Sequence, residues 1–143
     1  MIVSQILKAK GSDVATIAPD ALVSEAAARL ASGRIGALVV SGGGGAIAGI
    51  ISERDIVRAL AVAGAVALDS KVETLMSRNV ATCSPADSLE SLMREMTARR
   101  VRHLPVTKEG RLAGIVSIGD VVKHRLDELE RERAMLVSYV ASG

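Results

Sequence analysis

Two short segments of the chain place a serine three residues before an aspartate. They read GIISERD at residues 49–55 and GIVSIGD at residues 114–120. In each, an apolar run ends at the serine, and a predicted helix starts near the aspartate. A carboxylate can accept two hydrogen bonds from the vicinal hydroxyls of a ribose, and the amino terminus of a helix favours phosphate. The segments therefore hold residue types suited to nucleotide binding: Ser52, Asp55, Ser117 and Asp120.

The same spacing also has a structural interpretation. A serine followed three residues later by an acidic side chain forms a capping box, in which each side chain accepts a hydrogen bond from the backbone N–H of the other residue. For a single isolated copy this interpretation is favoured, because such caps are common. The glycines at the front of each segment, Gly49 and Gly114, would also let a flat base approach the backbone closely.

The two segments belong to a repeat that covers most of the chain. VATIAP at residues 14–19 matches VATCSP at residues 80–85, and AGIISERDIV at residues 48–57 matches AGIVSIGDVV at residues 113–122. Ahead of these matches, VSQILKAK resembles VETLMSRN. Two copies of one supersecondary unit are too few for a solenoid. We therefore expect the copies to pack on each other as a pseudo-twofold pair.

Each copy predicts the order helix, strand, helix, strand, strand, helix in an α+β fold. The glycine-rich segment at 42–45 predicts the turn of a hairpin. The middle helix of the second copy is marked by apolar residues at helical spacing: Leu89, Leu92, Met93 and Met96. The predicted boundaries are residues 1–68 for the first repeat, 69–126 for the second and 127–143 for a helical extension.

The predicted final helix carries an apolar stripe that runs beyond the second repeat. Its charged residues read as a solvated face, whereas its overlong apolar stripe also suits a contact between two copies of the chain. Periodicity does not name the partner surface. We predict a homodimer, with this helix contributing. The stripe is interrupted by Arg133 and consists of Val122, Leu126, Leu129, Leu136 and Val140.

Composition excludes several classes of protein. Apolar residues make up 49% of the chain and charged residues 24%, with no Phe, no Trp and one Tyr, so the core is aliphatic. A net charge of +2 and the lack of stacking aromatics argue against nucleic acid. The single cysteine, Cys83, excludes an intramolecular disulfide and reads as a small buried hydrophobe. One cysteine and two histidines make a zinc site improbable, and we predict no metal.

The longest uncharged run, residues 35–52, is interrupted by SGGGG at 41–45, so we interpret it as two buried strands rather than a membrane span. The first residues contain no apolar core or cleavage site of a secretion signal. We therefore expect a cytoplasmic protein without a membrane partner.

The duplicated unit resembles a pair of cystathionine-β-synthase (CBS) domains, a Bateman module. The resemblance rests on VATIAP and VATCSP, IGALVV and RHLPV, and GIISERD and GIVSIGD, and it covers the chain from about Val3 to Leu126. It implies two repeats that pack through their sheets, with two clefts related by a pseudo-twofold axis. In this family the clefts bind adenosine-containing ligands such as AMP, ADP, ATP, NAD(H) or S-adenosylmethionine.

The resemblance also implies roles for individual residues. Asp55 and Asp120 would hold the ribose, with Ser52 and Ser117 beside them, and the adenine would lie between the early strand and the hairpin strand. On the early strands the implied site residues are Thr16, Pro19, Thr82 and Pro85. On the hairpin strands they are Gly36, Ala37, Leu38, Arg102, His103 and Leu104.

The two copies differ in charge. Arg102 and His103 of the second copy stand where the first copy has Gly36 and Ala37. In the family, a basic pair at this position reaches across the pseudo-twofold axis to a phosphate that is bound mainly by the other repeat. The alternative for the basic pair is a solvated strand edge.

This difference implies two unlike clefts. The cleft at Asp55 would gain the basic pair and its own Arg54. The cleft at Asp120, with Gly119 in the place of Arg54, would be open and nearly neutral.

We therefore predict a regulatory adenine-nucleotide-binding module that senses cellular energy or redox state and signals to a partner protein. We expect no catalysis, because the sequence has no P-loop and no nucleophile with a base beside it. Two alternatives remain. One is an adaptor that binds protein or nucleic acid through the basic edge and the terminal helix. The other is an enzyme that uses His103 as general acid or base.

Overall fold

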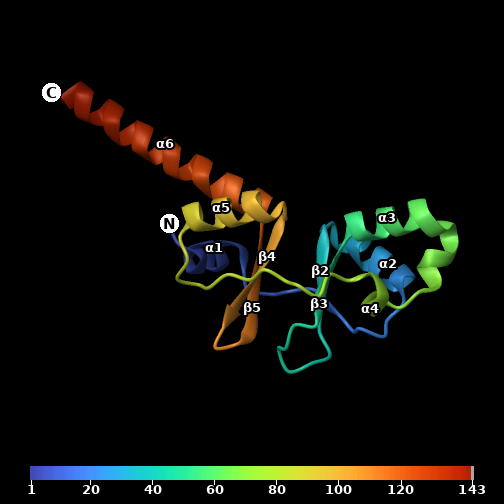
Figure 1. Ribbon diagram of the computed structural model, residues 1–143. Coiled ribbons are helices and arrows are strands. Elements are labelled where there is room, and N and C mark those ends of the chain that lie inside the picture. Colours follow the sequence, from blue (N-terminus) through green and yellow to red (C-terminus); the bar gives the residue numbers. More distant parts are fainter. Residues whose placement is uncertain (143) are drawn as a thin grey trace.

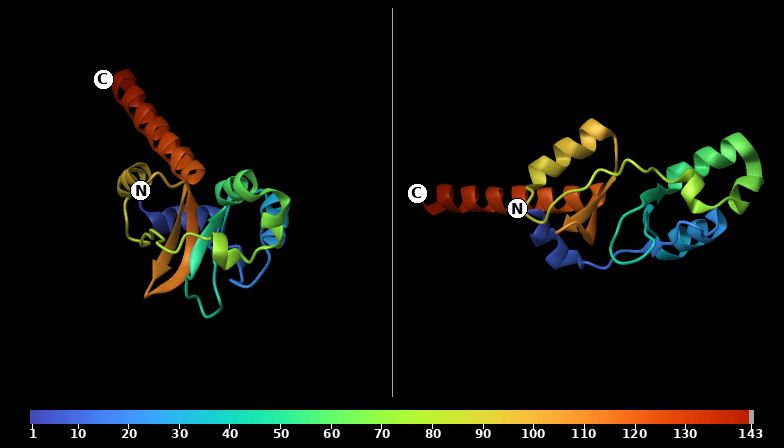
Figure 2. Two further views of the ribbon diagram at one scale, coloured as in Figure 1. Left: turned by 45° about the vertical axis from the view of Figure 1, so that its right-hand side comes forward. Right: turned by 60° about the horizontal axis from the view of Figure 1, so that its bottom comes forward.

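The computed structural model describes residues 1–142 and has two halves that lie side by side. Each half contributes a small sheet to the middle of the molecule, and the helices cover the outer sides (Figure 1). This arrangement confirms the predicted α+β fold of two repeats packed through their sheets. One helix leaves the body and projects away from both halves (Figures 1 and 2).

The first half is built on a three-stranded sheet in the order β1-β2-β3. Strand β1 pairs in parallel with β2, and β2 pairs antiparallel with β3 in the register Leu38↔Ile51. Its elements are β1 (Thr16–Ile17), α2 (Val23–Gly33), β2 (Ala37–Val40), β3 (Gly49–Ser52), α3 (Glu53–Ala63) and the 3-10 helix η1 (Gly64–Asp69).

The second half repeats this plan with a longer hairpin. Its elements are α5 (Leu89–Arg99), β4 (His103–Lys108), β5 (Arg111–Ser117) and α6 (Ile118–Ser142). The early strand expected before Pro85 is reduced to one bridge, in which Cys83 N–H donates to Pro105 O at 3.0 Å and Thr107 N–H donates to Cys83 O at 2.9 Å. Cys83 is buried, as predicted for a small hydrophobe.

The helices that precede the two repeats exchange places. Helix α1 (Val3–Lys10) packs in the core of the second half, where Val3 and Ile6 lie with Leu89 and Leu104. Helix α4 (Val72–Leu75) packs in the core of the first half, where Val72 lies among residues of α2 and β2. The predicted boundaries at residues 68 and 126 describe the repeat in the sequence, whereas each core draws its leading helix from the other repeat.

Main-chain hydrogen bonds fix this exchange. Pro19 O accepts from Glu73 N–H at the start of α4, and Pro85 O accepts from Ser4 N–H at the start of α1, both at 2.9 Å. Since the two contacts are equivalent by the repeat, each proline segment anchors the leading helix of the other copy.

Gly49 and Gly114, the glycines that begin the two repeated segments, make room for the exchanged helices α4 and α1 to pack closely. A Cβ built on Gly49 would lie 2.7 Å from Met76 Sδ, and a Cβ on Gly114 would lie 2.7 Å from Leu7 Cδ2. Met76 directly follows α4, and Leu7 belongs to α1. The expectation that the glycines make room for a flat base is therefore replaced by close packing of the exchanged segments.

The helical extension expected at 127–143 is continuous with the last helix of the second repeat. Helix α6 has 25 residues, and Val121 and His124 in its first turns are buried against the second half. Residue 143, the end of the predicted extension, lies outside the described residues. Among residues 1–142, no helix combines the length and hydropathy that a membrane crossing requires.

Candidate functional site

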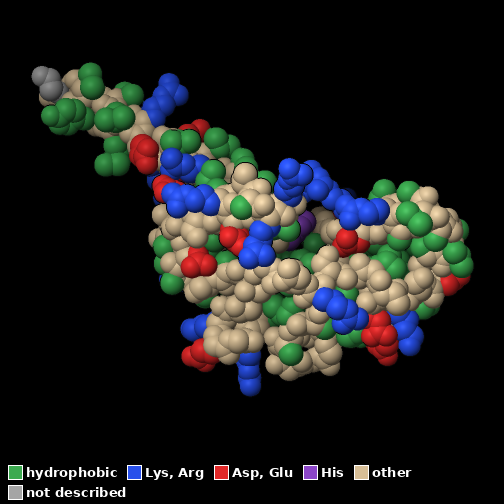
Figure 3. All heavy atoms as spheres, in the orientation of Figure 1, with side chains coloured by type: hydrophobic (Ala, Val, Ile, Leu, Met, Phe, Trp, Pro, Cys, Tyr) green, Lys and Arg blue, Asp and Glu red, His purple; other side chains and the backbone are tan. Residues whose placement is uncertain are grey.

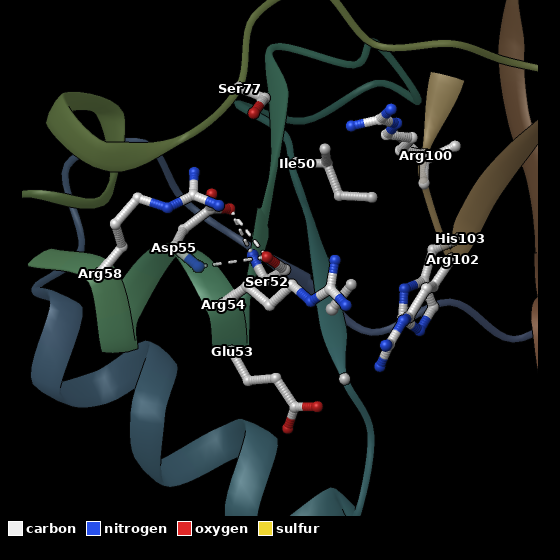
Figure 4. Close-up of a pocket in the computed structure, with 13 residues that line it drawn as sticks. Ile50, Ser52, Glu53, Arg54, Asp55, Arg58, Ser77, Arg100, Arg102 and His103 are labelled. Atoms are coloured by element: carbon white, nitrogen blue, oxygen red, sulfur yellow. Dashed lines mark hydrogen bonds between the residues drawn. The ribbon is translucent and has the colours of Figure 1, made fainter. Parts of the chain in front are cut away.

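A hollow opens between the two halves beside the amino end of α3. Ser52, Arg54 and Asp55 line it from the first half, and Arg102 and His103 line it from the second (Figure 4). The hollow has a volume of about 190 Å³, smaller than most small-molecule sites, and it opens to solvent at its mouth. The structure therefore brings together the charged residues that the sequence assigns to the cleft at Asp55.

Ser52 and Asp55 form the capping box of α3. Asp55 Oδ2 accepts from the backbone N–H of Ser52 at 2.8 Å and from the Ser52 hydroxyl at 3.0 Å, and Asp55 N–H donates to Ser52 Oγ at 3.3 Å (Figure 4). The structural interpretation of this segment is thus confirmed. The hydrogen bonds of the Asp55 carboxylate within the described residues all fall on Oδ2. Its second oxygen, Oδ1, has acceptor capacity for a ligand.

The amino terminus of α3 is only partly open. Glu53 N–H donates to Gly36 O at 3.0 Å, and Asp55 N–H is held by Ser52. The equivalent first N–H of α6, at Ile118, donates to Arg102 O at 2.8 Å. Few backbone N–H groups at the start of α3 are therefore free to bind a phosphate, although the sequence suggests that role for them. Most of the positive charge at the hollow comes from side chains instead.

Four arginines surround the hollow. Arg54 and Arg58 stand on α3, while Arg100 and Arg102 approach from the segment between α5 and β4 (Figure 4). Lys and Arg side chains gather above the junction of the two halves (Figure 3). Two carboxylates, Asp55 and Glu53, also line the hollow, and the four guanidinium groups outnumber them, so the hollow favours an anion.

His103 packs edge to backbone against Gly36 and contributes to two hollows. A Cβ on Gly36 would lie 3.0 Å from His103 Cε1 and 3.6 Å from Glu53 Oε1. Burial lowers the pKa of His103; Glu53 and Asp120 act in the opposite direction, and Lys10 and Arg102 lower it further. The imidazole is therefore neutral at pH 7, and an anion bound beside it would favour its protonation.

The second hollow lies beside Ser117 and is also lined by Gly36 and Ala37. Lys10 and Arg34 line it together with the acidic Asp13, so fewer uncompensated positive charges line this hollow than the one at Asp55. Lys10 Nζ donates to Asp120 Oδ2 at 2.6 Å and to Ile115 O at 2.9 Å. The carboxylate predicted to hold a ribose is therefore already paired within the protein.

The Lys10 pair determines the ionisation of Asp120. Burial raises the pKa of this carboxyl, but hydrogen bonds from Lys10 and from the backbone N–H of Ser117 lower it more, and the net pKa lies below the ordinary value. The Asp120 side chain is 21% exposed and that of Lys10 is 30% exposed. Lys10, held by this ion pair, therefore forms part of the wall of the second hollow.

Several predicted site residues lie elsewhere. Leu38 and Leu104 are fully buried, one in each core, and do not reach a hollow. Gly119 faces a shallow groove on the outer side of α6, with Val122 and Leu126. The early-strand residues line neither hollow, since the two threonines are exposed and the two prolines anchor the exchanged helices: Thr16, Thr82, Pro19 and Pro85.

Four basic residues that line the hollows have no site role predicted from the sequence: Arg58, Arg100, Lys10 and Arg34. Arg34 and Arg100 are equivalent by the repeat, and both end a helix in the left-handed conformation, at φ 51° and 55°. Arg58 stands one helical turn after Arg54, a spacing visible in the sequence. No group of three or more potential metal-ligating side chains occurs within residues 1–142.

A family model for the CBS domain matches residues 3–62 and 72–127. The chain is therefore a member of the CBS-domain family and contains two such domains in tandem. It is 34% identical over 149 residues to the mitochondrial CBS domain-containing protein CBSX3 of Arabidopsis thaliana, covering 99% of this chain and 72% of that protein.

Solved structures agree with this assignment. The CBS-domain containing protein ATU1752 from Agrobacterium tumefaciens is 46% identical, with a TM-score of 0.85 over 87% of this chain and 99% of that one. PAE2072 from Pyrobaculum aerophilum, complexed with AMP, is 26% identical, with a TM-score of 0.73 over 84% and 89% of the chains. The CBS pair of MJ0100, complexed with 5-methylthioadenosine and S-adenosyl-L-methionine, is 26% identical, with a TM-score of 0.80 over 90% and 98%.

Proposed function

We propose that this CBS pair is a regulatory module that binds an adenine nucleotide in the hollow at Asp55 and signals its presence to a partner protein. The observation that carries the proposal is that one hollow holds an open carboxylate oxygen and four arginines, two of which come from the opposite half. Two similar structures contain adenosine-based ligands, which supports this ligand class.

The hollow suits the two polar parts of such a ligand. Asp55 Oδ1 can accept from a ribose hydroxyl, while Arg102 and Arg54 can hold a phosphate through charge-assisted hydrogen bonds. Ala37 and Ile50 supply the apolar wall, and dispersion against aliphatic side chains replaces aromatic stacking on the base. The ligands that fit this chemistry are AMP, ADP, ATP and NAD(H).

We further propose that the two clefts are unequal because Lys10 closes the one at Asp120. A ribose there would meet a carboxylate whose charge is already compensated by the Lys10 ammonium, which makes two hydrogen bonds. One nucleotide per chain, in the Asp55 hollow, is the expected stoichiometry. We propose a binding role, which the adenosine-based ligands of two similar structures support.

Calorimetric titration with AMP tests the site through two matched variants. Asp55→Ala and Asp120→Ala each remove the acid of an equivalent capping box, which lowers fold stability by about 1 kcal/mol, and Asp120→Ala also loses the ion pair with Lys10. Only Asp55→Ala should also lower the affinity for AMP, by roughly tenfold or more, because a hydrogen bond to a charged group contributes about 1.5–3 kcal/mol. Equal affinity of both variants would refute the assignment of the ribose to Asp55.

A second pair of variants isolates the phosphate contact. Arg102→Ala should lower the affinity for AMP. Lys108→Ala removes the same charge from the far, exposed end of β4 and should leave AMP binding unchanged. Adenosine, which has no phosphate, should bind both variants alike. If Arg102→Ala and Lys108→Ala behave identically with AMP, then the phosphate does not lie between the halves.

A further inference from the structure

Helix α6 extends well beyond the body of the protein (Figures 1 and 2). Its first turns are anchored, because Val121 and His124 are buried and the amino group of Met1 lies 3.7 Å from Glu128 Oε1. From residue 129 to residue 142 every residue is exposed. A helical segment of this length is marginally stable in water without a packing partner.

The unpacked part is also apolar. Leu129 is 43% exposed, Leu136 66% and Val140 75%, and together with Val122 and Leu126 they form one line along the helix. Such a line on a projecting helix indicates a binding surface, since isolated apolar side chains need no partner but a contiguous stripe does.

The spacing of this line identifies the kind of partner. Its positions follow one another in steps of four, three, four, three and four, which is the heptad repeat of a coiled coil. We call it the α6 seam; its members are Val122, Leu126, Leu129, Arg133, Leu136 and Val140. In heptad notation Leu129 and Leu136 occupy d positions and Val140 an a position, and a β-branched a residue with Leu at d favours two-stranded parallel coiled coils.

The charge at the centre of the seam fits a second copy in the same direction. In a parallel pair, Arg133 at an a position packs into a hole that includes the preceding g residue of the other helix, which is Glu132 of the second copy. By symmetry the pair forms twice. The arginine that interrupts the apolar seam therefore finds a carboxylate on the other copy.

The opposite direction is disfavoured by like charges. When the six seam positions are matched in an antiparallel pair, e positions face e positions and g positions face g positions. Glu130 then faces Glu130 of the second copy, and Glu132 faces Glu132 of the second copy. Like charges across such an interface cost affinity and suppress the wrong arrangement.

We propose that the α6 seam binds a second copy of this chain as a parallel, two-stranded coiled coil in which Arg133 pairs with Glu132 of the other copy. The proposal does not depend on nucleotide binding, because the seam and the hollow at Asp55 lie on different elements.

The first test is the mass of the protein in solution, measured by light scattering. The wild-type chain should be a dimer at micromolar concentration, and Leu129→Glu with Leu136→Glu should convert it to a monomer. The matched control, Arg131→Glu with Ala134→Glu, places two glutamates on the opposite face of the same helix and should remain dimeric. A monomeric wild type, or a dimer that survives glutamates in the seam, would overturn the proposal.

The second test is a charge exchange. Glu132→Arg alone and Arg133→Glu alone each place like charges together, so each should weaken the dimer by at least severalfold. The double variant restores opposite charges and should recover wild-type dissociation to within a few-fold. Because adjacent residues on a helix do not face each other, recovery reports a contact between copies. Failure to recover would exclude the Arg133–Glu132 pair.

The third test asks whether the two α6 helices run parallel or antiparallel. A cysteine at Val140 should form a disulfide with its own counterpart under mild oxidation, whereas a cysteine at Ala134, on the opposite face, should not. Both variants retain the buried Cys83, which serves as an internal control. Cross-linking of Val140→Cys only to Val122→Cys in a mixture would establish the antiparallel arrangement and overturn the proposal.

Discussion

Lys10 and Asp120 are 110 residues apart in the sequence, yet Lys10 Nζ lies 2.6 Å from Asp120 Oδ2. The contact exists because α1 crosses from the first repeat to the core of the second half. It gives the two repeats different chemistry at equivalent positions. Asp55 has no such counterion among the described residues, whereas Asp120 is paired with an amine from the protein itself.

Removing this amine should open the second cleft. Lys10→Met keeps much of the apolar stem of the side chain but leaves the Asp120 carboxylate unpaired. The expected result is a second, weaker AMP site, so that calorimetric stoichiometry rises from one to two per chain. Lys8→Met, on the same helix and exposed, is the control and should still bind one AMP. A single site in Lys10→Met would show that the ion pair does not close the cleft.

The Lys10–Asp120 pair should also stabilise the fold in a pH-dependent way. The pKa of Asp120 is lowered in the folded state, so its contribution is fully present above the unfolded value of about 3.9. It is lost as the pH falls below that value through the folded pKa. Urea unfolding should therefore give a constant difference between wild type and Asp120→Asn from neutral pH down to about 5, and a shrinking one below about 4. A difference that is the same at every pH would contradict the ion pair.

His103 should make nucleotide binding sensitive to pH. Its pKa is lowered mainly by burial, so the imidazole in the folded protein is neutral at pH 7 and remains so as the pH begins to fall below about 6.5. A bound phosphate stabilises the charged imidazole and raises that pKa again. Proton uptake should then accompany binding, and AMP affinity should rise as the pH is lowered from 7.5 toward 5.5, within about one unit either side of the ordinary value.

The matched variant for this effect is His103→Gln, which keeps a polar side chain without a titrating group. The AMP phosphate itself takes up a proton near pH 6, and this background occurs equally in both proteins. The difference between their pH profiles therefore isolates His103. Parallel profiles would place the imidazole away from the phosphate.

The repeat predicts half of the site and explains why the other half is hidden. Ser52 with Asp55 and Arg102 with His103 can be located from the sequence because each pair occupies equivalent strand ends in the two copies. Lys10 cannot, since GSD at 11–13 follows it without a counterpart in the second copy. Nothing local indicates that α1 packs in the other half.

The buried strands show a second limit of sequence patterns. The family resemblance implies that Leu38 and Leu104 line the hairpin-strand side of the clefts. All four residues of β2 are buried, since helices cover one face of its sheet and the second sheet covers the other (Figure 2). With both faces covered, alternation no longer separates a cleft side from a core side.

Alanine substitutions at Gly49 and Gly114, which pack against the exchanged helices, should lower fold stability by different amounts. A Cβ on Gly49 would meet Ser77 O at 2.7 Å, and that carbonyl accepts from Ile50 N–H, so backbone atoms and a strand bridge must move. A Cβ on Gly114 would meet only the flexible end of Leu7. Overpacking costs roughly 1–3 kcal/mol, and Gly49→Ala should lie at or above the upper end.

Urea unfolding of the single and double variants checks this ranking. Leu7→Ala removes the methyl groups that oppose the new Cβ, so Gly114→Ala combined with Leu7→Ala should be less destabilising than the sum of the two single changes. Met76→Ala should give less relief to Gly49→Ala, because the carbonyl of Ser77 remains in place. Equal losses of unfolding free energy at the two glycines, or full recovery of Gly49→Ala by Met76→Ala, would contradict this ranking. Either result would mean that the packing of Gly49 beside α4 adapts as readily as that of Gly114 beside α1.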